Sequence, residues 1–520
     1  MIFKHKYLIS AIFFLLCFFV FSVSVNAKAS KYGGVAVFSF LNRIDSLDPT
    51  VSDNLNSLQI SSGIFDGLVK FNPETSKIEP SLARKWITSD YKVWTFFLQK
   101  NIKFHDGTDF TSEAVKFNFE HILLNNKQNY TSNYRFYKNI FGNNGEYIKS
   151  IDTPERYKIR ITLAYPDVLF LYKLAMPELS IQSPVALKKV LIGDTYKPVG
   201  TGPFYFSEWR RSGRIILNKN INYNDTVYLD RVIFEPYSDV DYCIRQMLRG
   251  VTDISSSGMS KKDFEKKNLE TNFSFLNSPS DSLFFLLLNP ERKEFENSSA
   301  RRAVSYLIDK KDLAKEYNGV EAYSFLTPSM FGYTKKNFSY NTDDITSFLS
   351  SIESDRVFTL IYPEDNFFDL KSVENLAIKI QKYLRAGGVK VILKKLSYDE
   401  YISALLNKSY DIAFWGERDI YGSPDIYLPL IYSVRVFKKM TGKSSEWTYE
   451  FDSLIKQVRS EVKPNKRKNV YLSIDNLLSD NMPSIPLFYK NNTVVYSDRV
   501  NNLIYTPSGT IILRNIWVTN

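Results

Sequence analysis

Side chains that could act as nucleophiles, general bases or metal ligands are scarce in this chain of 520 residues, which holds three histidines and two cysteines. His5 and Cys17 lie at the N-terminus, in or just before an apolar run, so a folded domain keeps His105, His121 and Cys243. One cysteine cannot form a disulfide within the chain, and it leaves a thiolate-ligated metal site short of ligands. The sequence therefore predicts no cofactor and no metal site.

Catalytic motifs are absent as well. The chain has no Gly-x-Ser-x-Gly elbow and no phosphate-binding glycine loop. His105 stands in a turn, where a structural role is expected. Paired carboxylates such as Glu364 and Asp365 could do acid and base work on a glycoside, but adjacent acids are usually solvated. We expect no enzymatic activity, and a secreted hydrolase that uses these two acids is the alternative.

The segment from Val199 to Trp209 contains the densest pattern in the chain, Val-Gly-Thr-Gly-Pro followed by aromatic residues. Gly200 and Gly202 permit backbone angles that other residues avoid, and Pro203 fixes its own φ. Aromatic residues favour strands. The segment is expected to be a rigid turn that leads into a strand.

The overall composition favours binding rather than catalysis. The chain carries 34 tyrosines and 39 phenylalanines, and aromatic side chains supply rigid contact area in a cleft. The net charge of +11 is spread thinly, and basic pairs such as Lys261-Lys262 are short. Such pairs are typical of solvated faces, so we expect no nucleic acid partner.

The N-terminus predicts export. Lys4 and Lys6 precede an apolar run over residues 8–25, and small residues follow at Ala27 and Ala29. This pattern is that of a secretory signal peptide cleaved after Ala27 or Ala29, with an uncleaved anchor as the alternative. The rest of the chain has no second apolar run of the length that a membrane helix needs.

Alternating strand and helix patterns predict an α/β protein with two sheets, one on each side of the middle of the chain. In the first half, a helix over 239–249 ends at Gly250 between two strands. In the second half, strands over 357–361, 389–393 and 410–415 alternate with helices. Ser298 or Ser299 and Asp369 are expected to cap two of these helices.

The order of motifs along the chain resembles that of the peptide-, dipeptide- and nickel-binding extracellular solute-binding proteins of ABC importers, family 5. The resemblance covers essentially the whole mature chain. Its motifs are Phe65-Asp-Gly-Leu68, Pro80-Ser-Leu-Ala-Arg-Lys-Trp86, Trp94-Thr-Phe-Phe-Leu98, Phe104-His-Asp-Gly107, Val199-Gly-Thr-Gly-Pro203, Arg301-Arg-Ala-Val-Ser-Tyr-Leu-Ile-Asp309, Tyr410-Asp-Ile-Ala413, Ser423-Pro-Asp425 and Pro483-Ser-Ile-Pro-Leu487.

This resemblance implies a periplasmic-binding-protein-like α/β fold, with two α/β lobes around a ligand cleft and an extra inserted lobe. The ligand is expected between lobes I and III, which close over it by a hinge motion. The implied divisions are a signal peptide over 1–27, lobe I over 28–63, 196–283 and 488–520, lobe II over 64–195, and lobe III over 284–487.

The resemblance also implies ligand contacts. In peptide-binding relatives an aspartate shortly before the Pro-Asp of lobe III holds the ligand's α-ammonium, and Asp419 is the best match. Its segment is about one residue longer than the dipeptide-binding pattern, so Glu417 competes for this role. Arg418 could meet a carboxylate, and Trp415 begins the segment. Gly200, Thr201 and Gly202 are expected beside the cleft, where glycines would let the backbone approach the ligand.

One departure from the family concerns specificity. Dipeptide binders have an arginine for the ligand carboxylate in the loop where this chain has Pro363-Glu-Asp-Asn-Phe-Phe368. Two acids there would repel a carboxylate, so a longer peptide or a cationic ligand fits better. The resemblance implies a monomeric periplasmic receptor that delivers peptides, oligopeptides in particular, to permease subunits in the inner membrane. A receptor for a cationic solute or metal chelate and a sensor that does not transport remain alternatives.

Overall fold

A computed structural model describes residues 31–41, 44, 46–51, 55–72, 75, 77–128, 141, 145–191, 195–256, 259, 263–264, 273–336, 341–364, 370, 372–418, 424–433, 438, 445–506 and 509–519. For residues 125–128, 278–281, 417–418 and 430 it describes the backbone alone. Among these residues no helix is both long and apolar enough to span a bilayer.

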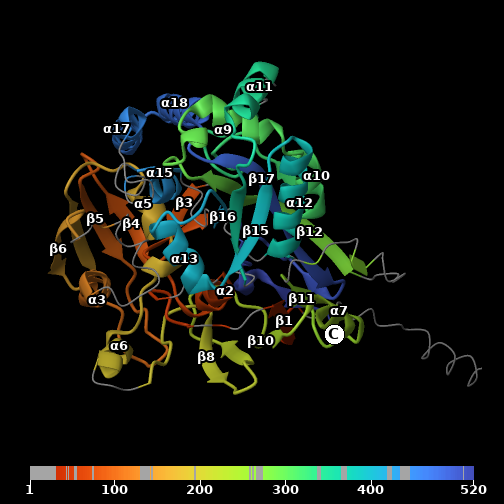
Figure 1. Cartoon of the computed structure of the whole chain (residues 1–520). Helices are drawn as coiled ribbons and strands as arrows, with labels where there is room; N and C mark the ends of the chain where they lie inside the picture. The colour runs from red at the N-terminus through yellow and green to blue at the C-terminus, as the bar shows by residue number, and fades with distance from the viewer. Residues whose placement is uncertain are drawn as a thin grey trace, which may run out of the picture.

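One eleven-stranded sheet runs through the molecule (Figure 1). Strand β13 (Gly319–Glu321) pairs with β17 beside the main path. The order along that path is β15 (Val391–Leu396), β14 (Phe358–Pro363), β16 (Ile412–Arg418), β12 (Phe273–Leu288), β17 (Ile485–Ser497), β11 (Ile254–Ser255), β1 (Val35–Leu41), β10 (Arg231–Tyr237), β9 (Ile215–Lys219) and β8 (Phe204–Trp209).

Strands β12 and β17 carry the sheet from one half of the molecule to the other. They pair antiparallel over most of their length, with an irregularity in register between Ser278 and Ser282. From residue 283 to 288, alternate side chains of β12 enter two different hydrophobic cores. A strand covered on both faces reads as a continuous apolar run, which explains the sequence of this segment.

The half of the sheet with β1 is built around a parallel crossover. Helix α7 (Val240–Leu248) connects β10 to β11, and both strands lie parallel to β1. Asp239 caps α7 through the backbone amide of Tyr242, and Gly250 follows the helix with φ +68°. The helix predicted over 239–249 is therefore confirmed. Helix α2 (Leu55–Ile64) and the C-terminal strands β18 (Val500–Asn501) and β19 (Trp517–Val518) complete this half.

The half with β14 and β16 is a second α/β layer. Helices α12 (Val373–Ala386) and α13 (Tyr398–Leu406) connect β14, β15 and β16, and β14 lies parallel to both of the other strands. The other helices here are α9 (Ser298–Tyr306), α10 (Lys310–Glu316), α11 (Thr342–Ser351), α14 (Pro424–Tyr427), α15 (Pro429–Tyr432), α17 (Glu446–Ser460) and α18 (Pro464–Asn481).

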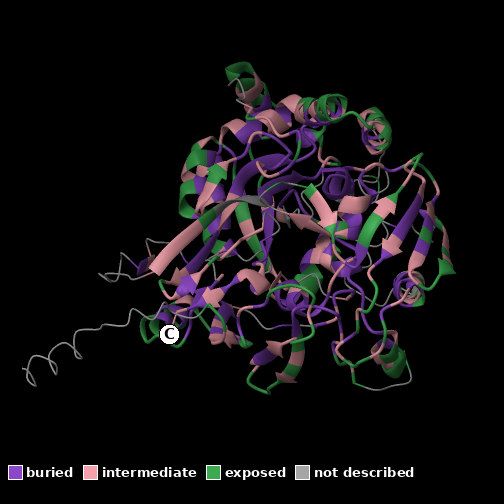
Figure 2. Ribbon diagram, turned by 180° about the vertical axis from the view of Figure 1, so that it is seen from behind, coloured by how far each residue is buried: buried purple, intermediate pink, exposed green. Residues whose placement is uncertain are grey.

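A separate four-stranded sheet lies to one side, at the left of Figure 1. Its order is β4 (Ala83–Ile87), β5 (Val93–Leu98), β7 (Lys158–Leu163) and β6 (Ile148–Glu155), with α3 (Ser112–Gln128) packed against it. Strands β2 (Val69–Asn72) and β3 (Lys77–Pro80) and helices α5 (Phe170–Leu174) and α6 (Pro184–Leu191) accompany it. Figure 2 shows buried residues along the strands and exposed residues on the outer faces of the helices.

Several local predictions were wrong. The two predicted sheets are one, because β12 and β17 are long enough to belong to both halves. The cap of α9 is Asn297 rather than a serine, and Ser372 caps α12. Asp369, the cap expected for α12, lies outside the described residues. Asn297 lies just before the two predicted serines and Ser372 lies three residues after Asp369, and each accepts from a free amide at the start of its helix, so spacing alone did not distinguish the candidates.

Candidate functional site

The carboxyl ends of β14 and β16 meet at one edge of the central sheet, because these two strands run parallel. Ligands in α/β proteins commonly bind at this edge. Trp415 lies near the end of β16, and Glu364 follows β14 with an exposed side chain. Two of the residues singled out from the sequence therefore come from neighbouring strands and lie toward the same edge.

Trp415 is held in place by a second aromatic ring. It stacks on Tyr401 of α13, with ring centroids 6.3 Å apart and planes 10° from parallel. Tyr401 is fully buried, and its hydroxyl donates to the carbonyl of Phe414. Trp415 itself is only half-buried. The indole is thus held against the protein, where it packs on two hydrophobic cores, and the residue as a whole stays partly exposed.

The backbone of Glu417 and Arg418 continues β16 beside β12, opposite Leu283 and Ser282. This position is next to the irregularity in the pairing of β12 with β17. The side chains of Glu417 and Arg418 lie outside the described part of the chain, as does Asp419, so their contacts with a ligand stay a prediction.

The two glycines of the Val-Gly-Thr-Gly-Pro turn are required by a close approach of two backbone segments. A Cβ on Gly200 would lie 2.2 Å from the carbonyl oxygen of Ile64, and one on Gly202 would lie 2.6 Å from the same oxygen. The amide of Gly202 donates to that oxygen at 2.9 Å. The end of α2 therefore packs directly on the turn. That these glycines also lie close to a ligand stays a prediction.

His105 contacts the same turn from the other side. Its ring Nε2 lies 3.0 Å from the carbonyl oxygen of Gly202, and its own amide donates to the carbonyl of Gly200 at 2.9 Å. Burial lowers the pKa of His105, although the Gly202 carbonyl and Asp106 oppose the effect. These contacts assign His105 a structural role in the turn.

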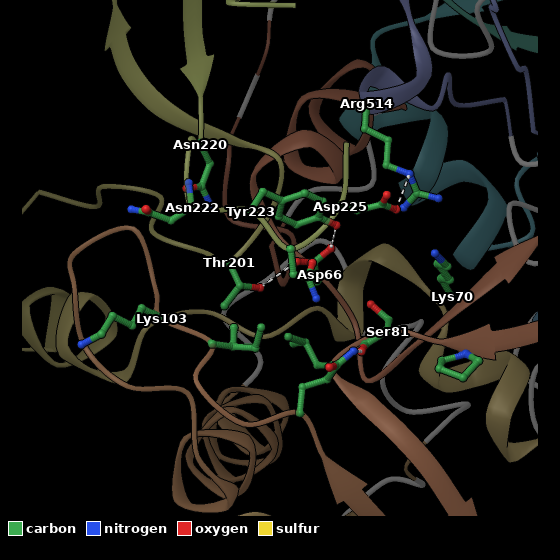
Figure 3. Close-up of a pocket in the computed structure, with 15 residues that line it drawn as sticks. Asp66, Lys70, Ser81, Lys103, Thr201, Asn220, Asn222, Tyr223, Asp225 and Arg514 are labelled. Carbon is green, nitrogen blue, oxygen red and sulfur yellow. Dashed lines mark hydrogen bonds and ion pairs between the residues drawn. The ribbon is translucent and has the colours of Figure 1, made fainter. Parts of the chain in front are cut away.

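Thr201 points into a polar cavity of about 190 Å³ (Figure 3). Its hydroxyl donates to Asp66 at 2.9 Å, and the Tyr223 hydroxyl donates to the other oxygen of Asp66 at 3.1 Å. Burial raises the pKa of Asp66, which these two hydrogen bonds partly offset. The sequence motif Phe65-Asp-Gly-Leu68 marked Asp66, but its partner Thr201 lies too far along the chain to be recognised by spacing.

Lys70 and Arg514 also line this cavity, and Figure 3 shows their charged ends pointing toward one another. Burial, followed by the nearby Arg514, lowers the pKa of Lys70. All lining residues lie within 66–103, 201–225 or at 514. None belongs to the predicted lobe III, so this cavity is distinct from the cleft expected between lobes I and III.

In the described part of the chain, no group of three or more His, Cys, Asp or Glu side chains is arranged to hold a metal ion. Cys243 is buried against Ile244 and Met247.

Residues 77–438 match the bacterial extracellular solute-binding proteins, family 5. This segment is more than half of the chain. The protein belongs to family 5 of the extracellular solute-binding proteins. Members of this family serve ABC import and are not enzymes. The family predicted from the motifs is confirmed, and with it the periplasmic-binding-protein-like α/β fold.

Among curated relatives of this family 5 protein, the probable D,D-dipeptide-binding periplasmic protein DdpA of Escherichia coli is 26% identical over 484 residues, which cover 89% of this chain and 90% of the relative. The heme-binding protein A of Haemophilus influenzae is 24% identical over 477 residues, 86% of each chain. Relatives of nearly the same length therefore carry different ligands.

Among solved structures, the periplasmic binding protein DppA of Helicobacter pylori in complex with the peptide STSA superposes with a TM-score of 0.79. The two sequences are 25% identical, and the alignment covers 94% of this family 5 chain and 99% of the other. The likeness thus extends over all three parts of the fold rather than over one lobe.

Proposed function

We propose that this family 5 protein is a periplasmic receptor that captures peptides, oligopeptides in particular, and delivers them to the permease of an ABC transporter. The observation that carries this proposal is its whole-length similarity to the DppA of Helicobacter pylori, whose structure contains a four-residue peptide. A receptor of this kind needs a hinge, a cleft and a way to hold both polar ends or the main chain of its ligand.

An acidic edge on the predicted lobe III supports a ligand with a positive end. Glu364 is exposed after β14, and in the neighbouring strand β16 the backbone of Glu417 comes one residue before the last, Arg418. In our proposal Asp419, which follows in sequence, accepts hydrogen bonds from the ligand's α-ammonium, and Trp415 offers an apolar face to the peptide. Ion pairs of this kind favour one orientation of the ligand.

The test is titration of the protein, produced without residues 1–27, against a library of di-, tri- and longer peptides by isothermal calorimetry. We expect binding that is strongest for peptides longer than two residues and that is lost when the N-terminus is acetylated. Acetylation removes the charge that an acidic anchor needs and leaves the rest of the peptide unchanged. Equal affinity for acetylated and free peptides would contradict the anchor, and absence of any binding would contradict the function.

A cationic solute is the second candidate, and the acidic edge at Glu364 favours it. Native mass spectrometry of the protein purified from its own periplasm separates the two. A ladder of copurified masses that fragment into amino acids supports peptides, whereas one compound of constant mass supports a dedicated small-molecule receptor.

A further inference from the structure

A buried contact joins the segment around α5, in the predicted lobe II, to helices α14 and α17 of the predicted lobe III. Leu169 precedes α5 in sequence but belongs to the hydrophobic core around Tyr401, and it is 5% exposed. Ile426 of α14 belongs in turn to the core around Trp94 of the four-stranded sheet. Each side therefore inserts an apolar side chain into the core of the other, and Val168 and Tyr172 pack against the same core as Leu169.

Four charged side chains lie at the centre of this contact. Lys173 and Asp167 come from the lobe II side, with side chains 1% and 0% exposed. Asp425 of α14 is 0% exposed and Arg459 of α17 is 14% exposed. Two positive and two negative charges are thus buried together.

Each side is neutral by itself. Lys173 forms a direct ion pair with Asp167, which also accepts hydrogen bonds from the Tyr147 hydroxyl at 2.6 Å and the Leu169 amide at 2.8 Å. On the other side, Arg459 lies 3.4 Å from the Asp425 carboxylate and donates to the Asp425 carbonyl at 3.0 Å. Every buried charge therefore keeps its main partner on its own lobe.

Fewer polar contacts cross between the two sides. Lys173 Nζ lies 3.8 Å from the Asp425 carboxylate, and the Val168 amide donates to the Arg459 carbonyl at 2.9 Å. The Arg459 guanidinium reaches the hydroxyl of Tyr165 at 3.5 Å. Burial would raise the pKa of Asp167, but Lys173, Arg459 and the hydrogen bonds hold that pKa below its ordinary value, so its carboxylate stays charged.

This arrangement differs from a permanent core in one respect. A buried charge whose partner departs is strongly destabilising, because it is left unpaired. Separation of the two sides leaves no charge without its ion-pair partner, since Lys173 stays with Asp167 and Arg459 stays with Asp425. The sides can part at the cost of a long ion contact, two hydrogen bonds and the exposure of Leu169 and Ile426, together with the packing of Val168 and Tyr172.

We propose that this contact is a releasable latch between lobes II and III, in which two self-neutral ion pairs and two exchanged apolar side chains hold the closed form. The connection through β12 and β17 is the only strand pairing that joins the central sheet's two halves among the described residues, so a hinge there lets the latch open. The use of this latch in ligand capture rests on the proposed function, but the latch itself is testable in the protein without ligand.

The experiment measures the distance between lobes by pulsed electron paramagnetic resonance, without ligand. Spin labels are placed at Ile87 on β4 and Tyr449 on α17, which are 57% and 61% exposed, in a Cys243→Ala background. The test variant combines Lys173→Met with Asp167→Asn, which removes one ion pair and keeps the charge balance. A second variant, Leu169→Glu, places a carboxylate in the core of lobe III.

The matched control combines Lys293→Met with Glu353→Gln, an ion pair of predicted lobe III with side chains 68% and 64% exposed. We expect the parent and the control to share one distance distribution. Both latch variants should gain a longer-distance population at least threefold larger than in the parent, with native near-ultraviolet circular dichroism. Unchanged distances in both variants would overturn the latch.

Failure of both variants to fold would equally overturn it, because a releasable contact leaves each lobe folded. Since no ligand is present, these outcomes do not depend on whether peptides bind. A protein that binds no peptide but whose latch variants open would contradict the proposed function and support the latch.

Discussion

Gly202 illustrates how single residues determine the shape of this protein. Its φ is not in the left-handed region, so the reason for glycine is space: a Cβ there would lie 2.6 Å from the carbonyl carbon and oxygen of Ile64 and 2.8 Å from the carbonyl oxygen of Gly63. Backbone atoms cannot rotate away as a flexible side chain can. Any larger residue must push α2 off the turn.

We therefore expect Gly202→Val to lower the free energy of unfolding by about 3 kcal/mol or more, the upper range for overpacked sites. Thermal and urea unfolding of the mature protein check this. Gly250→Asn is the control, because Gly250 has φ +68° with nothing within 4 Å of its added Cβ, and asparagine tolerates that backbone region. An unchanged unfolding curve for Gly202→Val together with altered ligand preference would contradict the structural role.

Asp419 is the residue on which the proposed ligand anchor depends. Asp419→Asn keeps the shape of the side chain and removes its charge, so we expect peptide affinity to fall by about 2–4 kcal/mol, roughly 30-fold to 1,000-fold. Calorimetry with one well-bound peptide measures this. Glu417→Gln is the matched control and should change affinity much less. The opposite ranking of the two variants would move the anchor to Glu417.

Helix α10 begins with a lysine whose side chain points into the protein. Lys310 is 4% exposed, and its ammonium donates to the carbonyl of Ala322 at 3.3 Å. Burial lowers the pKa of Lys310 from 10.5 to about 7. The next residue, Lys311, is exposed. Two adjacent lysines thus face opposite environments on one helix.

This burial predicts a pH-dependent stability. Between about pH 7 and pH 10 the unfolded chain keeps Lys310 protonated while the folded state releases the proton, so the unfolded state binds more protons. Stability must then rise with pH across this window, with a slope of up to about 1.4 kcal/mol per pH unit from this group, and fall as the pH drops toward 7.

Urea unfolding at several pH values checks the slope. Lys310→Met should remove this contribution and stabilise the protein most near pH 7, where the lysine is most costly. Lys311→Met is the control and should leave the pH dependence unchanged. The same slope in Lys310→Met as in the parent would show that another group causes it.

In the whole molecule, two connections join the half with β1 to the half with β14 and β16. The continuous sheet through β12 and β17 makes them one hydrogen-bonded unit, while the contact between Leu169 and the core around Tyr401 joins them on another side. A sheet connection can bend at an irregularity in register, whereas a side-chain contact must separate. In the closure that we propose, the sheet bends while the side-chain contact forms or separates.

Export is also a property of the whole chain. We expect the protein recovered from the periplasm to begin at Lys28 or Ser30, because Ala27 and Ala29 follow the apolar run in the pattern of a signal peptidase site. Intact mass spectrometry measures this directly. Ala27→Leu combined with Ala29→Leu should retain the full-length mass in the membrane fraction. A mature mass unchanged by these substitutions would place the cleavage elsewhere.

Much of the architecture was predictable because its signals are local. The helix expected over 239–249 with Gly250 after it is α7, and the continuous apolar run over 283–288 is a strand buried on both faces. The order of family motifs along the chain was enough to identify the family. In each case the physical cause, periodicity, capping or turn chemistry, acts within a few residues.

Only the tertiary structure shows which residues far apart in the sequence contact one another. The structural role expected of His105 is a contact of its ring with the Gly202 carbonyl, and Thr201, expected beside the ligand cleft, donates a hydrogen bond to Asp66 in a separate cavity. The neutral pairs at Lys173 and Arg459 are separated by hundreds of residues and acquire meaning only when the lobes meet. Chain spacing carries no information on such contacts, because packing brings them together and burial determines their energies.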